Sequence, residues 1–181
     1  MVSLSDPAVA TIPVRESGEP LADLRTVAAL RLDSRLADEE GLYARLRIGV
    51  VDRLVTAQTL LPAGLRLLIV EGYRPPAESS EELRTRSPHV TGAAVDLSLC
   101  TMDEVELDLG TAVGDTATER CHTEDPAIGA DARRNREILA AALRAAGLVN
   151  YPAEWWHWSY GDRYWAYVTG SQSACYGPAS P

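Results

Sequence analysis

Apolar residues recur at helical spacing in two parts of the chain. From Leu42 to Leu60, one stripe holds Leu42, Leu46, Val50, Leu54 and Ala57, with charged residues off it. This pattern predicts an amphipathic helix that ends before Pro62-Ala63-Gly64. A second helix is predicted from Asp131, as N-cap, to Gly147, as C-cap glycine. Its buried stripe is expected to comprise Ile138, Leu139, Ala142 and Leu143.

Three shorter apolar runs predict strands. Residues 65–70 form a nearly continuous apolar run, residues 93–99 form another, and residues 154–160 form an aromatic one. Such short runs, bounded by glycine or proline, are typical of buried strands. The other segments are expected to be an extended lead-in over 1–20 with a short edge strand at 12–14, a helix-prone connector over 77–86, a hairpin and loop over 101–123, and a tail over 171–181. Residues 21–40 follow no single period, and the pattern leaves them open.

Composition narrows the class of protein. A chain of 181 residues with 46% apolar and 24% charged residues fits one globular domain spanning 1–181. The net charge of −9 disfavours nucleic acid as a partner. Neither a membrane-spanning run nor a signal peptide is evident, so we expect a cytoplasmic protein that does not bind membranes. Its oligomeric state is left open.

The three cysteines, Cys100, Cys121 and Cys175, have no paired spacing. Free thiols in a reducing cytoplasm are the simplest interpretation, and one disulfide with one free thiol is the alternative.

A histidine and an aspartate flank a glycine bend in the middle of the chain. His89 precedes Gly92, and Asp96 follows inside the apolar run 93–99. A carboxylate in such a run is costly to bury unless a cation or hydrogen bonds compensate it. A metal ion shared with His89 would supply that partner.

A second pair lies in the aromatic run. Glu154 precedes His157 by three residues, so a fully extended strand would point the two side chains to opposite faces. For both to reach one site, the chain must turn or bulge at Trp155-Trp156. His89, Asp96 and His157 would then form a set typical of a catalytic zinc ion with a fourth position open to water.

These candidates have roles in such a site. Glu154, not ligating the metal, would take the proton of a zinc-activated water and pass it to the leaving amine. Arg74, placed where the strand 65–70 stops, would stabilise the developing oxyanion. The alternatives are a hydrogen-bonded structural role for each histidine and an exposed surface position for Arg74.

Other features have simpler explanations. Cys121 and His122 could form a thiol–imidazole pair or a second metal site, but adjacent residues in an acidic loop usually form neither. The tryptophans and tyrosines of 155–167 could form a stacking platform, although the absence of Phe favours a core role for most of them. One or two could line the cleft, and we expect Trp156 to contact substrate. The acidic residues 103–108 are interpreted as solvated surface.

Three motifs in order carry a family resemblance. Gly72-Tyr73-Arg74-Pro75, then Ser87-x-His89-x-x-Gly92-x-Ala94-x-Asp96, then Glu154-x-Trp156-His157 resemble the D-alanyl-D-alanine dipeptidase family of zinc peptidases, which includes the vancomycin-resistance enzyme. The resemblance extends from about residue 49 to residue 167. It implies a compact α+β domain in which an antiparallel sheet, with flanking helices, carries the zinc.

The resemblance also implies roles for individual residues. It makes His89, Asp96 and His157 the ligands of one Zn²⁺ per chain, Glu154 the catalytic base and Arg74 the transition-state arginine. Ser87 matches a substrate-contacting position, and Asp115 is the nearest match to the aspartate that holds the substrate's ammonium. The implied activity is hydrolysis of a small D-amino-acid peptide, with D-Ala-D-Ala the leading candidate, in cell-wall metabolism or antibiotic resistance.

Two departures from the family pattern bear on the substrate. Arg74 and His89 are only fifteen positions apart, where vancomycin-resistance dipeptidases carry a long helical insertion, and Gly114 replaces an aromatic residue before Asp115. A more open cleft is therefore expected. The alternatives are a D,D-carboxypeptidase acting on longer peptidoglycan stems, and a zinc module with a biosynthetic or peptide-binding role.

Overall fold

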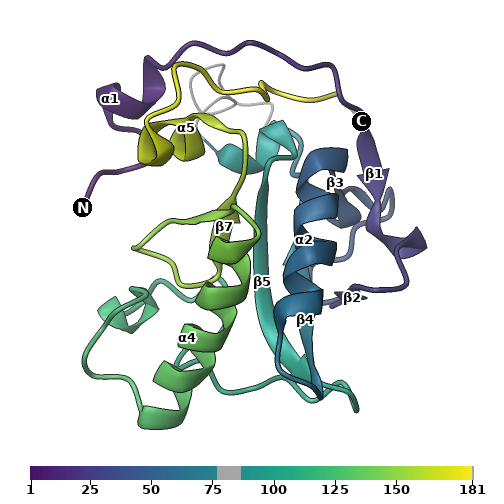
Figure 1. Ribbon diagram of the computed structural model, residues 1–181, viewed down its shortest axis with the longest axis vertical. Coiled ribbons are helices and arrows are strands. Elements are labelled where there is room, and N and C mark those ends of the chain that lie inside the picture. Colours follow the sequence, from purple (N-terminus) through teal and green to yellow (C-terminus); the bar gives the residue numbers. More distant parts are fainter. Residues whose placement is uncertain (77–86, 181) are drawn as a thin grey trace.

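A five-stranded sheet forms the centre of the molecule (Figure 1). The computed structural model describes residues 1–76 and 87–180. The strand order is β2 (Arg31–Leu32), β4 (Leu65–Glu71), β5 (Ala94–Thr101), β7 (His157–Ser159) and β6 (Val149–Asn150). All neighbours pair antiparallel except β2, which is parallel to β4. The expected α+β class is confirmed, although the sheet is mixed at this one edge.

Two helices pack against the sheet and against each other: α2 (Ile48–Leu60) and α4 (Ala130–Ala145) (Figure 1). Their apolar side chains join alternate residues of β5, Val95, Leu97 and Leu99, in the hydrophobic core. Because successive side chains of a strand point to opposite faces, Asp96 and Ser98 point away from these helices. On β7, Trp158 joins the core, so His157 and Ser159 lie on the same face as Asp96.

The helix predicted over 42–60 begins later than expected. Residues Leu42–Ala44 form a 3-10 turn (η2), and β3 (Arg45–Arg47) pairs with β1 (Leu21–Asp23) before α2 starts at Ile48. All five stripe residues are nevertheless buried. The helical spacing therefore identified the buried positions, but pairing with β1 set an extended conformation for Arg45–Arg47.

The N-terminal lead-in is less extended than predicted. Asp6 caps a one-turn helix, α1 (Pro7–Ala10), and the expected edge strand is reduced to a single parallel bridge between Val14 and Ala174. The open segment 21–40 contains β1, a 3-10 turn η1 (Leu24–Thr26) and β2. The predicted connector over 77–86 lies outside the described residues.

Other predicted elements shift at their ends. Gly129, not Asp131, is the N-cap of α4, and Asp131 lies in its first turn. The aromatic strand predicted over 154–160 is reduced to β7, because residues before His157 form turns, and α5 (Arg163–Thr169) follows it. The expected hairpin after β5 is a tight turn in which the Thr101 amide donates to the Val105 carbonyl, and a 3-10 turn, η4 (Glu119–Cys121), lies in the loop beyond. All three cysteines are free thiols.

No helix within residues 1–76 and 87–180 has the length and apolar character needed to cross a membrane.

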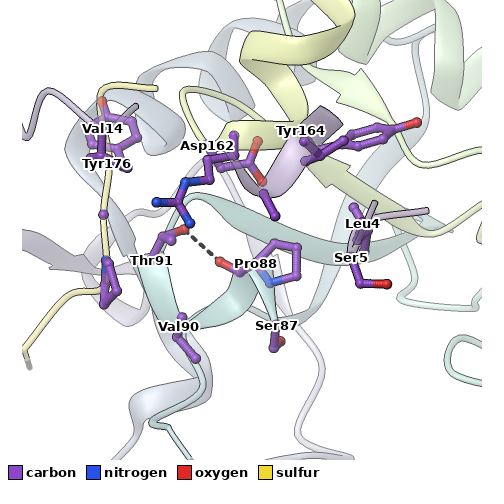
Figure 2. Close-up of a pocket in the computed structure, with 15 residues that line it drawn as sticks. Leu4, Ser5, Val14, Ser87, Pro88, Val90, Thr91, Asp162, Tyr164 and Tyr176 are labelled. Carbon is purple, nitrogen blue, oxygen red and sulfur yellow. Dashed lines mark hydrogen bonds between the residues drawn. The ribbon is translucent and has the colours of Figure 1, made fainter. Parts of the chain in front are cut away.

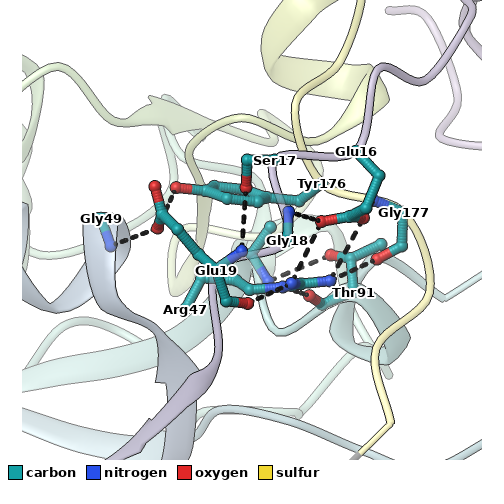
Figure 3. A network of polar contacts seen from close by, with 10 residues as sticks. Glu16, Ser17, Gly18, Glu19, Arg47, Gly49, Thr91, Tyr176 and Gly177 are labelled. Atoms are coloured by element: carbon teal, nitrogen blue, oxygen red, sulfur yellow. Dashed lines mark hydrogen bonds and ion pairs between the residues drawn. The ribbon is translucent and has the colours of Figure 1, made fainter.

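A buried arginine ties the lead-in and the tail to the loop before β5 (Figure 3). Arg47 is 5% exposed, and it donates hydrogen bonds to the carbonyls of Thr91, Glu19 and Gly177. Its guanidinium also pairs with the Glu16 carboxylate at 3.2 Å. Thr91 ends the 3-10 turn η3 (Pro88–Thr91), so this network supports the turn that carries His89.

Candidate metal centre

Three side chains from separate elements converge on one point. His89 lies on η3, Asp96 on β5 and His157 on β7, and their ligand atoms all lie within 4.8 Å of one another. Asp96 and His157 are directly opposite in the antiparallel register. Gly92, in the left-handed conformation with φ of 66°, ends η3 and turns the chain into β5. The structure thus brings together the two imidazoles and the carboxylate singled out in the sequence.

Both imidazoles face the same carboxylate oxygen. Oδ1 of Asp96 lies 2.9 Å from Nδ1 of His157 and 3.3 Å from Nε2 of His89. The other ring nitrogen of His89, Nδ1, lies 2.7 Å from the Gly72 carbonyl oxygen. A proton donated to that carbonyl leaves Nε2 with a free lone pair. Gly72 itself packs closely against β3, because a Cβ there would lie 2.5 Å from the Arg45 carbonyl oxygen.

Burial and charge set the protonation of the cluster. The three residues are only 3%, 7% and 3% exposed, for His89, Asp96 and His157 respectively. Burial opposes ionisation of Asp96, but attraction and hydrogen bonds from the two imidazoles outweigh it and hold the pKa of Asp96 well below its usual range. Burial likewise opposes protonation of His89, but Asp96 outweighs it and raises the pKa of His89. The cluster therefore favours an anionic carboxylate beside positive charge.

These donors fit a zinc ion. Two imidazole nitrogens and one carboxylate oxygen are ligands that zinc prefers, and donors on a tetrahedral zinc lie roughly 3.4 Å apart. The separations of 2.9 and 3.3 Å are close to that spacing. A buried carboxylate facing two ring nitrogens is the environment in which a divalent cation compensates charge.

Glu154 is close to the cluster because the chain turns before β7. The Glu154 carbonyl accepts a hydrogen bond from the His157 amide at 3.1 Å, which closes the turn predicted at Trp155-Trp156. Burial raises the pKa of Glu154, with Asp96 adding to the rise and the two imidazoles and Arg74 opposing it. Glu154 is therefore a half-buried carboxylate with a raised proton affinity beside the imidazole pair.

Arg74 follows β4 and lies next to His89 of the cluster. Its amide donates to the His89 carbonyl at 3.2 Å, and its guanidinium donates two hydrogen bonds to Glu71. The Arg74 side chain is half exposed, whereas Glu71 is buried. Sequence reasoning missed Glu71; a carboxylate three residues before the candidate arginine was the available signal.

The three predicted substrate contacts have different environments. Ser87 precedes η3 and lines a cavity of about 280 Å³ between the lead-in, α5 and η3 (Figure 2). Asp115 is exposed in the loop, where its carboxylate accepts from the Ala117 amide. Trp156 is 1% exposed and packs in the core beside Trp155. We therefore assign Trp156 to packing, because a side chain this buried presents almost no surface to a ligand.

The other sequence candidates do not form sites. Within the described ranges, the cluster of His89, Asp96 and His157 is the one group with metal-binding geometry, and it does not include Cys121 or His122. Trp155 and Trp158 are buried with Trp156 in the core, so they provide no stacking platform. In the acidic patch, Glu104 and Glu106 form surface ion pairs with Arg31 and Arg35.

Comparisons with known proteins agree with this arrangement. A family model described as D-ala-D-ala dipeptidase matches residues 70–172, which include all of the cluster. The D-alanyl-D-alanine dipeptidase of Synechocystis is 26% identical over 86% of this chain and 87% of its own. The enzymes of the same name from Escherichia coli and Enterococcus faecalis are 32% and 31% identical. Those two matches span about half of this chain, at 52% and 50%, and about half of each relative, at 55% and 48%.

Proposed function

Because the chain belongs to the D-ala-D-ala dipeptidase family of peptidases, we propose that it is a zinc-dependent hydrolase of small peptides ending in a D-amino acid. The observation that carries the proposal is the convergence of His89, Asp96 and His157, with Glu154 near enough for their charges to influence its pKa. We propose these three side chains as the ligands of one zinc ion per chain. Glu154 is the proposed base and Arg74 the proposed oxyanion-stabilising residue.

Zinc bound to two neutral imidazoles and one carboxylate would lower the pKa of bound water to roughly 7 and polarise a peptide carbonyl. Glu154 accepts the proton of the attacking water and returns it to the leaving amine. Its raised pKa favours this role, because a base works best when its pKa lies near the working pH.

Arg74 supplies positive charge at the edge of the cluster. Its guanidinium donates two hydrogen bonds to Glu71, which hold it in place, so it needs little reorganisation to face negative charge on the substrate carbonyl oxygen. Loss of such a donor typically costs about 10²- to 10³-fold in rate.

D-Ala-D-Ala is the substrate that the relatives' names favour. Ser87 next to η3 is a proposed substrate contact. We keep Asp115 as the proposed partner of the substrate ammonium. Its carboxylate is exposed and is therefore accessible to a charged ligand.

The experiment is a peptide panel assayed with wild type, Glu154→Gln and the matched control Glu124→Gln, which alters an exposed acid. The panel holds D-Ala-D-Ala, L-Ala-D-Ala, an N-acetylated dipeptide and a stem pentapeptide. We expect wild type to hydrolyse free D-Ala-D-Ala, Glu154→Gln to lose about 10²- to 10⁴-fold in kcat, and the control to match wild type.

Metal analysis completes the test. Wild type and Glu154→Gln should each hold one zinc, and a chelator should abolish turnover until zinc is restored. Full activity in Glu154→Gln would contradict the assigned base. Preference for the pentapeptide would instead indicate a D,D-carboxypeptidase.

A further inference from the structure

Four buried side-chain atoms lack a hydrogen-bond partner within the described residues, and two of them belong to β7 and the turn that follows it. These two are Nε2 of His157 and Oδ2 of Asp162. Buried polar atoms without a hydrogen bond are rare in folded proteins, because each costs roughly 1–3 kcal/mol of desolvation. One of these atoms is a potential donor, and the other is an acceptor.

Asp162 lies over the strand face that carries His157. The chain turns at Gly161, which has a φ of 79°, and Asp162 then reaches back to β7. Its Oδ1 accepts from the Ser159 hydroxyl at 2.9 Å and from the Trp165 amide at 2.7 Å. Ser159 and His157 are two residues apart on one strand, so their side chains share a face. Both donors bond to Oδ1, and Oδ2 is left without a partner among the described residues.

The surroundings of Asp162 are closed. The residue is 3% exposed and forms part of the wall of the cavity between α5 and η3, near Tyr164 (Figure 2). Burial raises the pKa of Asp162, while the charges of His157 and His89 oppose the rise, so the carboxylate lies within electrostatic reach of both rings.

The tautomer of His157 supplies the missing donor. Its Nδ1 faces Asp96 and the proposed metal position, so a neutral ring would carry its proton on Nε2 once Nδ1 binds a metal ion. Histidines that bind metals almost always donate their second N–H to a carboxylate or a carbonyl, which fixes the ring and strengthens the ligand. His89 has such a partner in the Gly72 carbonyl, whereas His157 has none among the described contacts.

Oδ2 of Asp162 and Nε2 of His157 are not paired with each other in this structure. We propose that Asp162 is a positioning residue for the metal centre: once a metal ion is bound, a rotation of either side chain brings Oδ2 to accept the Nε2–H of His157 and holds Nδ1 toward the metal. The proposal rests on the proposed function only in requiring that His157 bind a metal ion. The Ser159 hydroxyl and the Trp165 amide hold the other oxygen of Asp162, so the start of α5 and β7 together fix the carboxylate.

The test is Asp162→Asn. Asparagine keeps the size of the side chain and an acceptor for Ser159 and Trp165, but it places an NH₂ donor against the Nε2–H of His157. We expect about 10- to 100-fold weaker zinc affinity, measured by competition with a chromophoric chelator. The visible absorption of the Co²⁺-substituted protein should also change, and the Nε2–H proton of His157 should exchange faster by NMR in the zinc-loaded protein.

Two further variants separate positioning from folding. Asp162→Ser keeps a capping oxygen for α5 but removes Oδ2, and it should also weaken zinc binding. Asp38→Asn is the matched control, since Asp38 caps another turn by accepting from the Leu42 and Tyr43 amides. It should leave zinc affinity and the Co²⁺ spectrum unchanged.

The outcomes are decisive. Unchanged zinc affinity in a folded Asp162→Asn or Asp162→Ser protein would overturn the proposal. Loss of the fold in both variants would also overturn it, because Asp162 would then be a structural cap alone. If wild type binds zinc but hydrolyses no peptide of the panel, the proposed function is wrong. The zinc affinities of the Asp162 variants then still test this inference by themselves.

Discussion

The pKa values of two carboxylates beside the same imidazoles shift in opposite directions. Both imidazole rings face Asp96 and lower its pKa. At Glu154 burial is the dominant influence and raises the pKa. Pairs of acids whose environments push their pKa values apart are typical of sites in which one group stays charged and the other exchanges a proton. This difference supports the proposed roles, in which Asp96 stays charged as a metal ligand and Glu154 exchanges a proton.

Glu154 should titrate above an ordinary glutamate. A raised pKa means that the carboxyl keeps its proton to a higher pH, so it becomes a competent base only as the pH rises through that value. NMR titration of the side-chain carboxyl carbons of the metal-free protein should detect one glutamate that titrates above pH 4.5. That resonance should be absent from Glu154→Gln. A normal titration for Glu154 would contradict the role of burial.

The 3-10 turn η3 and its glycine position His89 relative to β5. Gly92 has a left-handed backbone, and a Cβ there would lie 2.3 Å from Cδ2 of Leu21. An added methyl group would therefore strain the backbone and also displace either β1 or η3. A shift of η3 moves His89 away from Asp96.

Gly92→Ala should weaken zinc binding as well as stability. Left-handed strain costs roughly 1–2 kcal/mol, and the collision with Leu21 adds to it. The matched control is Gly170→Ala, because Gly170 also caps a helix with a φ of 70° but has no atom within 4 Å of its Cβ position. Urea unfolding and chelator competition should find a smaller stability loss and normal zinc affinity in the control. Equal effects in both variants would mean that backbone strain alone decides.

Part of this site could be predicted from the sequence. His89, Asp96 and His157 were identifiable because a buried carboxylate needs a cation, and the turn at Trp155-Trp156 followed from the spacing of Glu154 and His157. Local patterns did not predict β3, since Leu46 fits a helical stripe while its conformation depends on pairing with Ala22 of β1, which lies far earlier in the chain. Asp162 follows a glycine and precedes a helix, so locally it was indistinguishable from an ordinary cap.

At the scale of the whole molecule, Arg47 connects segments that are distant in sequence. It holds residues near positions 16–19, the end of η3 and the tail at Gly177 in one network (Figure 3). Buried carbonyls that lose a charged donor are left unsatisfied, which is a costly kind of defect. The support of the His89 turn therefore extends to both the lead-in and the tail.

Arg47→Leu should destabilise the protein by about 3 kcal/mol, because several carbonyls and Glu16 lose their partner at once. The control is Arg134→Leu, which removes a surface arginine that pairs with Asp131 and should change the free energy of unfolding by less than about 0.5 kcal/mol. Urea denaturation measures both. Equal stabilities for the two variants would refute the central role of Arg47.

The register between β5 and β7 has a consequence for folding. Asp96 and His157 are 61 residues apart in sequence and meet only because their strands are aligned residue for residue. A slip of one position would send one of the two side chains to the opposite face. Only chains whose two strands pair in the correct register could bind the cation and gain its stabilisation. Cation binding would thus select the correctly paired fold over misaligned ones.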